Sequence, residues 1–201
     1  MASTALRLPT AFEEFMEWEP RQPERWEFME GCPRLMPDAS LRHNDIVANI
    51  AMTLRNYLRG TRCRVLMIRM KVKVPHERVA YPDVVVYCSQ RSGRDIIIDD
   101  PVVLIEVLSP STERYDRTVK QPAYETIPTL RYILLVGSDE PKVDIWSRQA
   151  DGAWQRLTVE ELTATARLNA LDIALPKAAI YEDIAFPLPE AVETEPPAAN
   201  A

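Results

Sequence analysis

Two nearly unbroken apolar segments constrain the fold of this chain most, and each of them carries one carboxylate. They are DVVVYC at 83–88 and VVLIEVLS at 102–109. Strands that are apolar at successive positions are typically buried on both faces of a sheet, so cover is needed on each side. Asp83 opens the first segment, and Glu106 lies inside the second. Because an unpaired buried charge is costly, we expect both acids to have a specific role.

The rest of the pattern predicts an α/β (α+β) fold with a mixed central sheet flanked by helices and an N-terminal β-hairpin. A short amphipathic helix at 11–18 precedes the hairpin at 25–37, whose turn is placed at Gly31. Ser40 is expected to cap a long helix that ends at Gly60. Further expected elements are strands at 66–74, 131–136 and 142–148, a polar strand around Trp154, and a helix within 109–128.

The length of 201 residues and the hydrophobic content of 46% suit one domain with its own core. We expect a lead-in at 1–10, a single domain at 11–187 and a disordered Pro/Ala/Glu-rich tail at 188–201. No apolar run reaches the roughly 18 residues of a membrane span, and the N-terminus does not resemble a signal peptide. The chain is therefore expected to be cytoplasmic, with no membrane partner.

The three cysteines give no disulfide or zinc pattern. Cys32, Cys63 and Cys88 are far apart in the sequence and odd in number, and they form no C-x-x-C pair. This spacing favours buried, reduced thiols.

The net charge of −6 and the sequence pI of about 5.1 argue against a protein that coats nucleic acid generally. They are compatible with a metal-dependent nuclease, because bound divalent cations supply positive charge where a phosphate sits. Locally, residues 46–76 contain no Asp or Glu. This stretch indicates either a surface that follows phosphates or an ordinary solvated basic face. Its basic residues are Arg55, Arg59, Arg62, Arg64, Arg69, Lys71 and Lys73.

The two strand carboxylates indicate a metal centre. If their strands are neighbours, Asp83 and Glu106 can converge at one end of the sheet. Oxygen ligands of this kind suit Mg²⁺ or Mn²⁺, and the backbone carbonyl of Val107 is a candidate for a further ligand. Such a metal polarises a phosphoryl oxygen, lowers the pKa of an attacking water and stabilises the leaving oxygen. The sequence therefore predicts a centre that hydrolyses phosphodiesters.

A lysine that assists this chemistry is expected on the helix that follows the Glu106 strand. Thr112, Asp116, Lys120 and Tyr124 are spaced by four residues, so they share one helix face that can look back at the strand ends. Lys120 would then orient the water or neutralise charge in the transition state. The alternative is an ordinary surface pair between Asp116 and Lys120. Pro122 falls inside this helix, where it is expected to kink the turn and re-aim Lys120, either into the site or away from it.

Several segments together resemble the Uma-type restriction endonuclease family, which belongs to the PD-(D/E)XK nuclease superfamily. They are YPDVVVY, VVLIEVLSPST, the D-x-x-x-K-x-x-x-Y run and IPTLRYILLV. ERWEFMEG and ASLRHNDIVANIAMTLRNYLRG are similar to the N-terminal portion of that family, and LPKAAIYEDIAFP to its C-terminal end. The resemblance covers roughly residues 11–187. It implies a restriction-endonuclease-like fold, a magnesium-dependent endonuclease activity on DNA, and a homodimer.

Within this resemblance, Asp83 takes the place of the first motif acid and Glu106 that of the second. The family motif expects a lysine two residues after the glutamate, and Leu108 stands there instead. The resemblance thus implies Lys120 as a replacement that has migrated to the helix.

Supporting positions are expected around these three residues. His43 resembles a family position near the start of the long helix, although a capping or core hydrogen bond is the plainer role for a single histidine. Glu27 on the hairpin is a candidate for an additional carboxylate. Ser109 and Thr112 are expected to cap the helix after the strand rather than to act as nucleophiles.

Two other readings stay open at this point. One is a catalytically inactive nuclease-fold module that binds nucleic acid or a protein partner, which the acidic charge, the missing motif lysine and Pro122 favour. The other is a structural dimer whose strand acids are simply ion-paired. An organic cofactor is not expected, because the chain has no Gly-rich phosphate loop and only five glycines.

Overall fold

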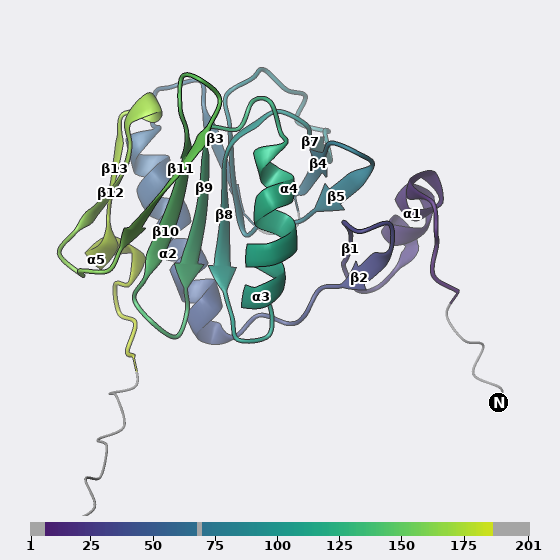
Figure 1. The fold of residues 1–201 in the computed structure, drawn as a ribbon, viewed down its shortest axis with the longest axis horizontal. Coiled ribbons are helices and arrows are strands. Elements are labelled where there is room, and N and C mark those ends of the chain that lie inside the picture. Colours follow the sequence, from purple (N-terminus) through teal and green to yellow (C-terminus); the bar gives the residue numbers. More distant parts are fainter. Residues whose placement is uncertain (1–6, 68–69, 187–201) are drawn as a thin grey trace, which may run out of the picture.

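The computed structural model describes residues 7–67 and 70–186. Its centre is a six-stranded mixed sheet with the order β11–β10–β9–β8–β6–β3 (Figure 1). β8 runs parallel to β9, and the other neighbours in this sheet are antiparallel. Its strands are β3 (Arg64–Met67), β6 (Val84–Tyr87), β8 (Pro101–Leu108), β9 (Tyr132–Gly137), β10 (Val143–Arg148) and β11 (Trp154–Val159).

Helices cover both faces of this sheet, as the two apolar segments predicted. α2 (Leu41–Tyr57) lies on one face, where its residue Ile50 belongs to the same apolar cluster as Ile105. α3 (Glu113–Tyr115), a π-helical turn at Asp116–Lys120 and α4 (Gln121–Glu125) form one continuous helical segment on the other face. There, Tyr124 shares a cluster with Leu104 and Leu108. Successive residues of β8 therefore enter two separate cores, which explains why nearly every position in the strand is apolar.

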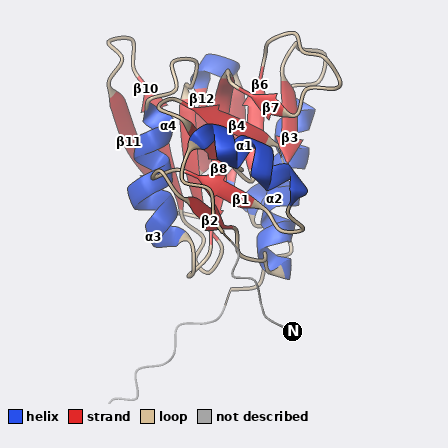
Figure 2. Cartoon of the chain, turned by 90° about the vertical axis from the view of Figure 1, so that its right-hand side faces the viewer, coloured by secondary structure: helices blue, strands red, loops and turns tan. Residues whose placement is uncertain are grey.

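The N-terminal hairpin and three strands from residues 71–98 form a second, five-stranded sheet with the order β2–β1–β5–β4–β7. The predicted hairpin is confirmed, with Gly31 at a φ of +73° in its turn. Figure 2 shows the hairpin and α1 in front of the strands of the main sheet. The elements of this region are α1 (Phe12–Trp18), a 3₁₀ turn (Glu19–Arg21), β1 (Trp26–Phe28), β2 (Pro33–Leu35), β4 (Lys71–Val74), β5 (Arg78–Ala80) and β7 (Ile97–Ile98).

The C-terminal part of the described chain packs against α2. It consists of the hairpin of β12 (Thr165–Leu168) and β13 (Ile173–Pro176), with a 3₁₀ turn (Asn169–Leu171) between them, followed by α5 (Lys177–Ile180). Across residues 7–67 and 70–186, no helix is both long and apolar enough to pass through a lipid bilayer. The predicted tail at 188–201 and most of the predicted lead-in at 1–10 lie outside the described residues.

The single strand expected at 66–74 is wrong. β3 ends at Met67 in the main sheet, and β4 begins at Lys71 in the second sheet. Residues 68–69 between them lie outside the described residues. An alternating pattern reports which face a residue occupies but not which sheet it belongs to, so the change of sheet leaves no signal.

The expectation of three buried, reduced cysteines is also wrong. Cys63 and Cys88 form a disulfide, and Cys32 is exposed. The register explains the pairing. Arg64 lies opposite Tyr87 in the antiparallel β3–β6 ladder, so Cys63, the residue before Arg64, lies opposite Cys88, the residue after Tyr87. Their Cα atoms are 3.9 Å apart, although 25 positions separate them in the sequence.

Candidate functional site

Asp83 lies directly before β6, at the end of the main sheet where α2 begins. The pairing of Val84 with Ile105 places Asp83 beside Glu106, and both side chains project from the same face of the sheet. Asp83 Oδ2 accepts a hydrogen bond of 2.7 Å from the backbone N–H of Val107. The carboxylates therefore lie on neighbouring strands and face the same side, which is the arrangement that a shared ion requires.

Glu106 is buried within β8, with 3% of its surface exposed. Its Oε1 is 2.8 Å from Lys120 Nζ and accepts a hydrogen bond of 2.5 Å from the hydroxyl of Tyr124. Burial raises the pKa of Glu106 well above its ordinary value, although the ammonium of Lys120 opposes this shift. The carboxyl is thus held by the ammonium of Lys120 and the hydroxyl of Tyr124, while burial disfavours its ionised form.

Lys120 sits among three carboxylates. Its Nζ is 2.8 Å from Glu106, 3.0 Å from Glu27 on the hairpin, and 3.6 Å from Asp116 one helical turn earlier. Burial by itself would lower the pKa of Lys120, but Glu106 and then Glu27 raise it well above its ordinary value. Lys120 is therefore a cation at neutral pH. The alternative of a surface pair between Asp116 and Lys120 is wrong, because both side chains are buried.

Pro122 does not displace Lys120 from the site. A π-helical turn at Asp116–Lys120 directly precedes α4, and the N–H of Gln121 donates to the carbonyl of Asp116, five residues earlier. Pro122 lies in the first turn of α4, where its missing N–H is best tolerated. The wide turn accommodates the proline, and both Lys120 and Tyr124 remain in contact with Glu106.

Thr112 stands at the N-cap position of α3, but its side chain makes no capping bond there. Its hydroxyl accepts a 3.3 Å bond from the N–H of Ser109 and is 3.1 Å from the Ser109 hydroxyl. The capping bond expected of the Thr112 side chain is therefore wrong. The Ser109 hydroxyl bonds the hydroxyls of Ser111 and Thr112 and no backbone N–H among the described residues, so its expected capping bond is wrong as well. Burial raises the pKa of Asp116, and Lys120 and the Thr112 hydroxyl oppose that rise.

His43 reaches Asp83 from the first turn of α2. Ser40 caps this helix as predicted, since its Oγ accepts a bond of 3.2 Å from the N–H of His43. The Nε2 atom of His43 is 3.2 Å from Asp83 Oδ2, and its Nδ1 is buried without a hydrogen-bond partner among the described residues. Burial lowers the pKa of His43, but the hydrogen bond and charge of Asp83 outweigh it and raise the pKa above its ordinary value.

These side chains line a cleft of about 1020 Å³ between the main sheet, the hairpin and the start of α2. Among the described residues, Asp83 Oδ1 and Glu106 Oε2 have no protein hydrogen-bond partner. No group of three or more His, Cys, Asp and Glu side chains within residues 7–67 and 70–186 is arranged to hold a metal ion. Two free carboxylate oxygens in a cleft nevertheless fit Mg²⁺, which is usually bound by one or two carboxylates together with water and substrate phosphates.

Of the residues proposed for nucleic-acid binding, those that the structure describes do not line this cleft. Arg55, Arg59 and Lys73 are exposed, so their role stays a prediction. Lys71 is wrong as a phosphate contact, because its ammonium is buried in a 2.8 Å ion pair with Glu19. Arg69 lies outside the described residues.

Two features of the cleft wall had no sequence signal. The N–H of Tyr81 donates a 2.8 Å bond to Glu27 Oε1, which fixes the hairpin carboxylate beside Lys120. On the next strand of the hairpin, the guanidinium of Arg34 lies 3.8 Å from the centre of the Tyr115 ring. Both contacts join segments that are far apart in the sequence.

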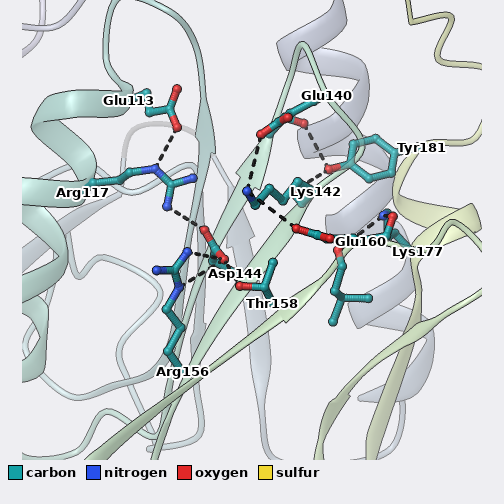
Figure 3. Close-up of polar contacts among 12 residues, drawn as sticks. Glu113, Arg117, Glu140, Lys142, Asp144, Arg156, Thr158, Glu160, Lys177 and Tyr181 are labelled. Carbon is teal, nitrogen blue, oxygen red and sulfur yellow. Dashed lines mark hydrogen bonds and ion pairs between the residues drawn. The ribbon is translucent and has the colours of Figure 1, made fainter.

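A second polar cluster lies outside the cleft, around Asp144 on β10 (Figure 3). Arg117 is 2.6 Å from Asp144 Oδ2, and Oδ1 accepts bonds of 2.8 Å from Arg156 and 2.6 Å from the hydroxyl of Thr158. Burial opposes the charge of Asp144, but these donors together lower its pKa. Both carboxylate oxygens are thus occupied, so Asp144 has the features of a structural ion pair.

Comparison with protein families and curated sequences gives a consistent result. The model of the Uma2 family, described as "Putative restriction endonuclease", matches residues 12–178. The Synechocystis sp. protein slr1290 is 34% identical over 178 residues, which cover 87% of this chain and 92% of that protein. A second Synechocystis sp. protein, sll1609, is 26% identical over 145 residues, which cover 70% of this chain and 82% of that protein.

Among solved structures, the chain is similar to an Anabaena variabilis protein described as "a putative nuclease belonging to DUF820". The TM-score is 0.70 at 17% sequence identity, and the match covers 86% of this chain and 97% of the other. At this identity the likeness shows the fold, and it confirms the predicted arrangement of a mixed sheet flanked by helices.

Proposed function

Because the chain belongs to the Uma2 restriction endonuclease family, we propose that it is a divalent-metal-dependent endonuclease that hydrolyses phosphodiester bonds in DNA. The observation that carries this proposal is the pair of carboxylates directly before β6 and within β8, which line a common cleft and each keep one oxygen without a protein hydrogen bond. A buried acid that has a raised pKa, a specific charge partner and a place in a cleft is a candidate for a functional site.

Asp83 and Glu106 would hold Mg²⁺ or Mn²⁺, with the backbone carbonyl of Val107 as a further ligand. The bound metal would supply Lewis acidity toward the phosphate and an activated water. Protein contacts already fix both ligands: the Val107 N–H and His43 hold Asp83, and Lys120 and Tyr124 hold Glu106. Contacts of this kind orient metal ligands and are worth about 10–100-fold in metal affinity or activity.

Lys120 would act as a fixed cation rather than as a base, because its raised pKa keeps the proton on Nζ at neutral pH. Its Nζ forms ion pairs of 2.8 Å with Glu106 and 3.0 Å with Glu27, and Asp116 is farther away at 3.6 Å. Because Lys120 also lines the cleft, its ammonium can meet the attacking water or a phosphoryl oxygen there. Lys120 thereby orients the water and offsets charge that develops on the phosphate.

The test is a nuclease assay on single-stranded and double-stranded DNA with Mg²⁺ or Mn²⁺, comparing the wild-type chain with the double variant Asp83→Asn/Glu106→Gln. We expect cleavage by the wild type and none by the double variant, with an unchanged circular dichroism spectrum. Asp144→Asn is the matched control, because it removes a buried carboxylate of the same sheet outside the cleft. Cleavage that survives in the double variant would overturn the assignment.

Calorimetric titration separates this proposal from its alternatives. The nuclease requires Mg²⁺ or Mn²⁺ uptake that the double variant loses. Absence of uptake together with salt-sensitive DNA binding would instead identify an inactive binding module. The homodimer that the resemblance implies stays a prediction, which light scattering of the wild-type chain tests directly.

A further inference from the structure

Arg34 is placed to meet the substrate of this cleft. It lies on β2 directly opposite Glu27, so the two side chains project from the same face of the hairpin. Glu27 touches Lys120, and Arg34 is one strand farther out, a spacing of about 4.8 Å. The guanidinium of Arg34 is therefore at the wall of the cleft, next to the proposed catalytic residues.

The other cations that line the cleft are already paired. Arg25 is 3.5 Å from Glu19, Arg42 is 2.9 Å from Asp139, and Lys120 is enclosed by carboxylates. In the part of the chain that the structure describes, Arg34 is the one arginine or lysine of the cleft lining without a carboxylate partner or a hydrogen bond. Its charge is thus available to an anion from solution.

Tyr115 holds this free charge in place. Its ring lies 3.8 Å below the guanidinium, and it is followed in the chain by Asp116 of the proposed site. Stacking fixes the plane of a guanidinium but leaves the N–H donors on its edge free. A planar edge with several donors matches the oxygens of a phosphate, which guanidinium groups bind with two parallel hydrogen bonds.

We propose that Arg34, stacked on Tyr115, binds a backbone phosphate of the DNA strand next to the scissile phosphate. This inference rests on the proposed function and adds a positioning residue to it. It also explains how a chain with a net charge of −6 and a carboxylate-lined cleft can hold a polyanion beside the metal site. This phosphate anchor, Arg34 stacked on Tyr115, contacts only the substrate backbone, so it favours no base sequence.

The experiment measures binding of a fluorescent oligodeoxynucleotide, single-stranded and duplex, over a series of salt concentrations. Ca²⁺ replaces Mg²⁺, so that oxygen ligands stay occupied by a divalent ion. We expect Arg34→Ala to weaken binding about tenfold. We also expect it to reduce the slope of log affinity against log salt by about 0.7 for single strands or 0.9 for duplex.

Two further variants make the result specific. Arg34→Lys should keep the salt slope and still bind more weakly, because it retains the charge and loses the planar fork. Arg167→Ala removes an exposed arginine on β12 outside the cleft, and it should match the wild type. In the Mg²⁺ cleavage assay, Arg34→Ala should raise KM and leave kcat within about twofold. Unchanged thermal unfolding of Arg34→Ala confirms that it is folded.

The failures of the two proposals are distinguishable. If the wild type cleaves DNA and Arg34→Ala retains the wild-type salt slope and KM, the phosphate anchor is overturned while the nuclease stands. The same holds if Arg34→Ala loses kcat with an unchanged KM. If the wild type neither binds nor cleaves either form of DNA, the nuclease proposal fails, and the anchor fails with it.

Discussion

Glu106 and Asp144 are two buried carboxylates on the same face of the same sheet. Each is paired across the ladder with Leu135, from opposite sides, so a single apolar residue separates them. Their surroundings nevertheless shift their pKa values in opposite directions. Burial dominates at Glu106 and raises its pKa, whereas hydrogen bonds from Thr158 and two arginines lower that of Asp144. Burial alone therefore does not distinguish a functional acid from a structural one.

The difference lies in what each carboxylate has left to bind. Both oxygens of Asp144 accept bonds, and its partners reach it from the helical segment and from β11 (Figure 3). At Glu106, Lys120 and the Tyr124 hydroxyl both contact Oε1, and the residue lines the cleft. A saturated carboxylate stabilises the fold, while one with a free oxygen can still bind a metal ion or a substrate.

The largest expected effect is the loss of activity in Glu106→Gln. The amide keeps the shape of the side chain and removes a candidate metal ligand, so kcat/KM for DNA should fall about a thousandfold or more. Lys120 retains Glu27 and Asp116, so the free energy of unfolding should change by less than about 1 kcal/mol. Cleavage kinetics and urea denaturation measure the two quantities. A stable variant with wild-type kinetics would make Glu106 as structural as Asp144.

Asp144→Asn should show the reverse pattern. It leaves Arg156 without a carboxylate partner and Arg117 with Glu113 alone, which should lower the free energy of unfolding by about 2 kcal/mol. This loss is smaller than for a fully buried pair, because both arginines are partly exposed. Urea denaturation measures the loss, and kcat per folded molecule should match the wild type. A loss of activity in the fully folded variant would contradict the structural role of Asp144.

The sequence predicted the parts of the site that depend on one segment or on adjacent strands. A carboxylate within an apolar strand is recognisable by itself, which located Asp83 and Glu106. The four-residue spacing placed Asp116, Lys120 and Tyr124 on one helix face, and the structure confirms this despite the π-helical turn. Local periodicity carries this information because it depends only on helix and strand geometry.

The sequence could not predict contacts that depend on how the two sheets meet. The disulfide of Cys63 and Cys88 follows from the β3–β6 register, and the burial of Lys71 follows from a change of sheet between β3 and β4. The contact between Arg34 and Tyr115 has no sequence pattern, since it depends on how the hairpin packs on the helix that carries Tyr115. These are tertiary contacts between distant segments, and neither spacing nor composition specifies them.

A smaller effect on stability and activity should follow from removing one hydroxyl that donates a hydrogen bond to each carboxylate. Tyr124→Phe deletes the 2.5 Å bond to Glu106, and Thr158→Val deletes the 2.6 Å bond to Asp144. Each variant should lose about 1 kcal/mol of unfolding free energy. Only Tyr124→Phe should also reduce kcat, by about tenfold, because it loosens a proposed metal ligand. Parallel denaturation and kinetic measurements check this pair, and an equal effect of both variants on kcat would contradict the distinction.

The smallest effect is a pH dependence that belongs to Asp144. Its pKa in the folded chain is lowered below the ordinary value of 3.8, so folding favours the ionised form. This stabilisation is fully present above the pKa of the unfolded chain, and it is lost as the pH falls through the folded pKa. The difference in unfolding free energy between the wild type and Asp144→Asn should therefore be constant from pH 7 to about pH 5 and shrink below about pH 4. Urea denaturation of both proteins across this range measures the difference. A difference that persists in full under strong acid would show that the asparagine disturbs packing, and that the ion pairs of Asp144 contribute little to the stability of the sheet.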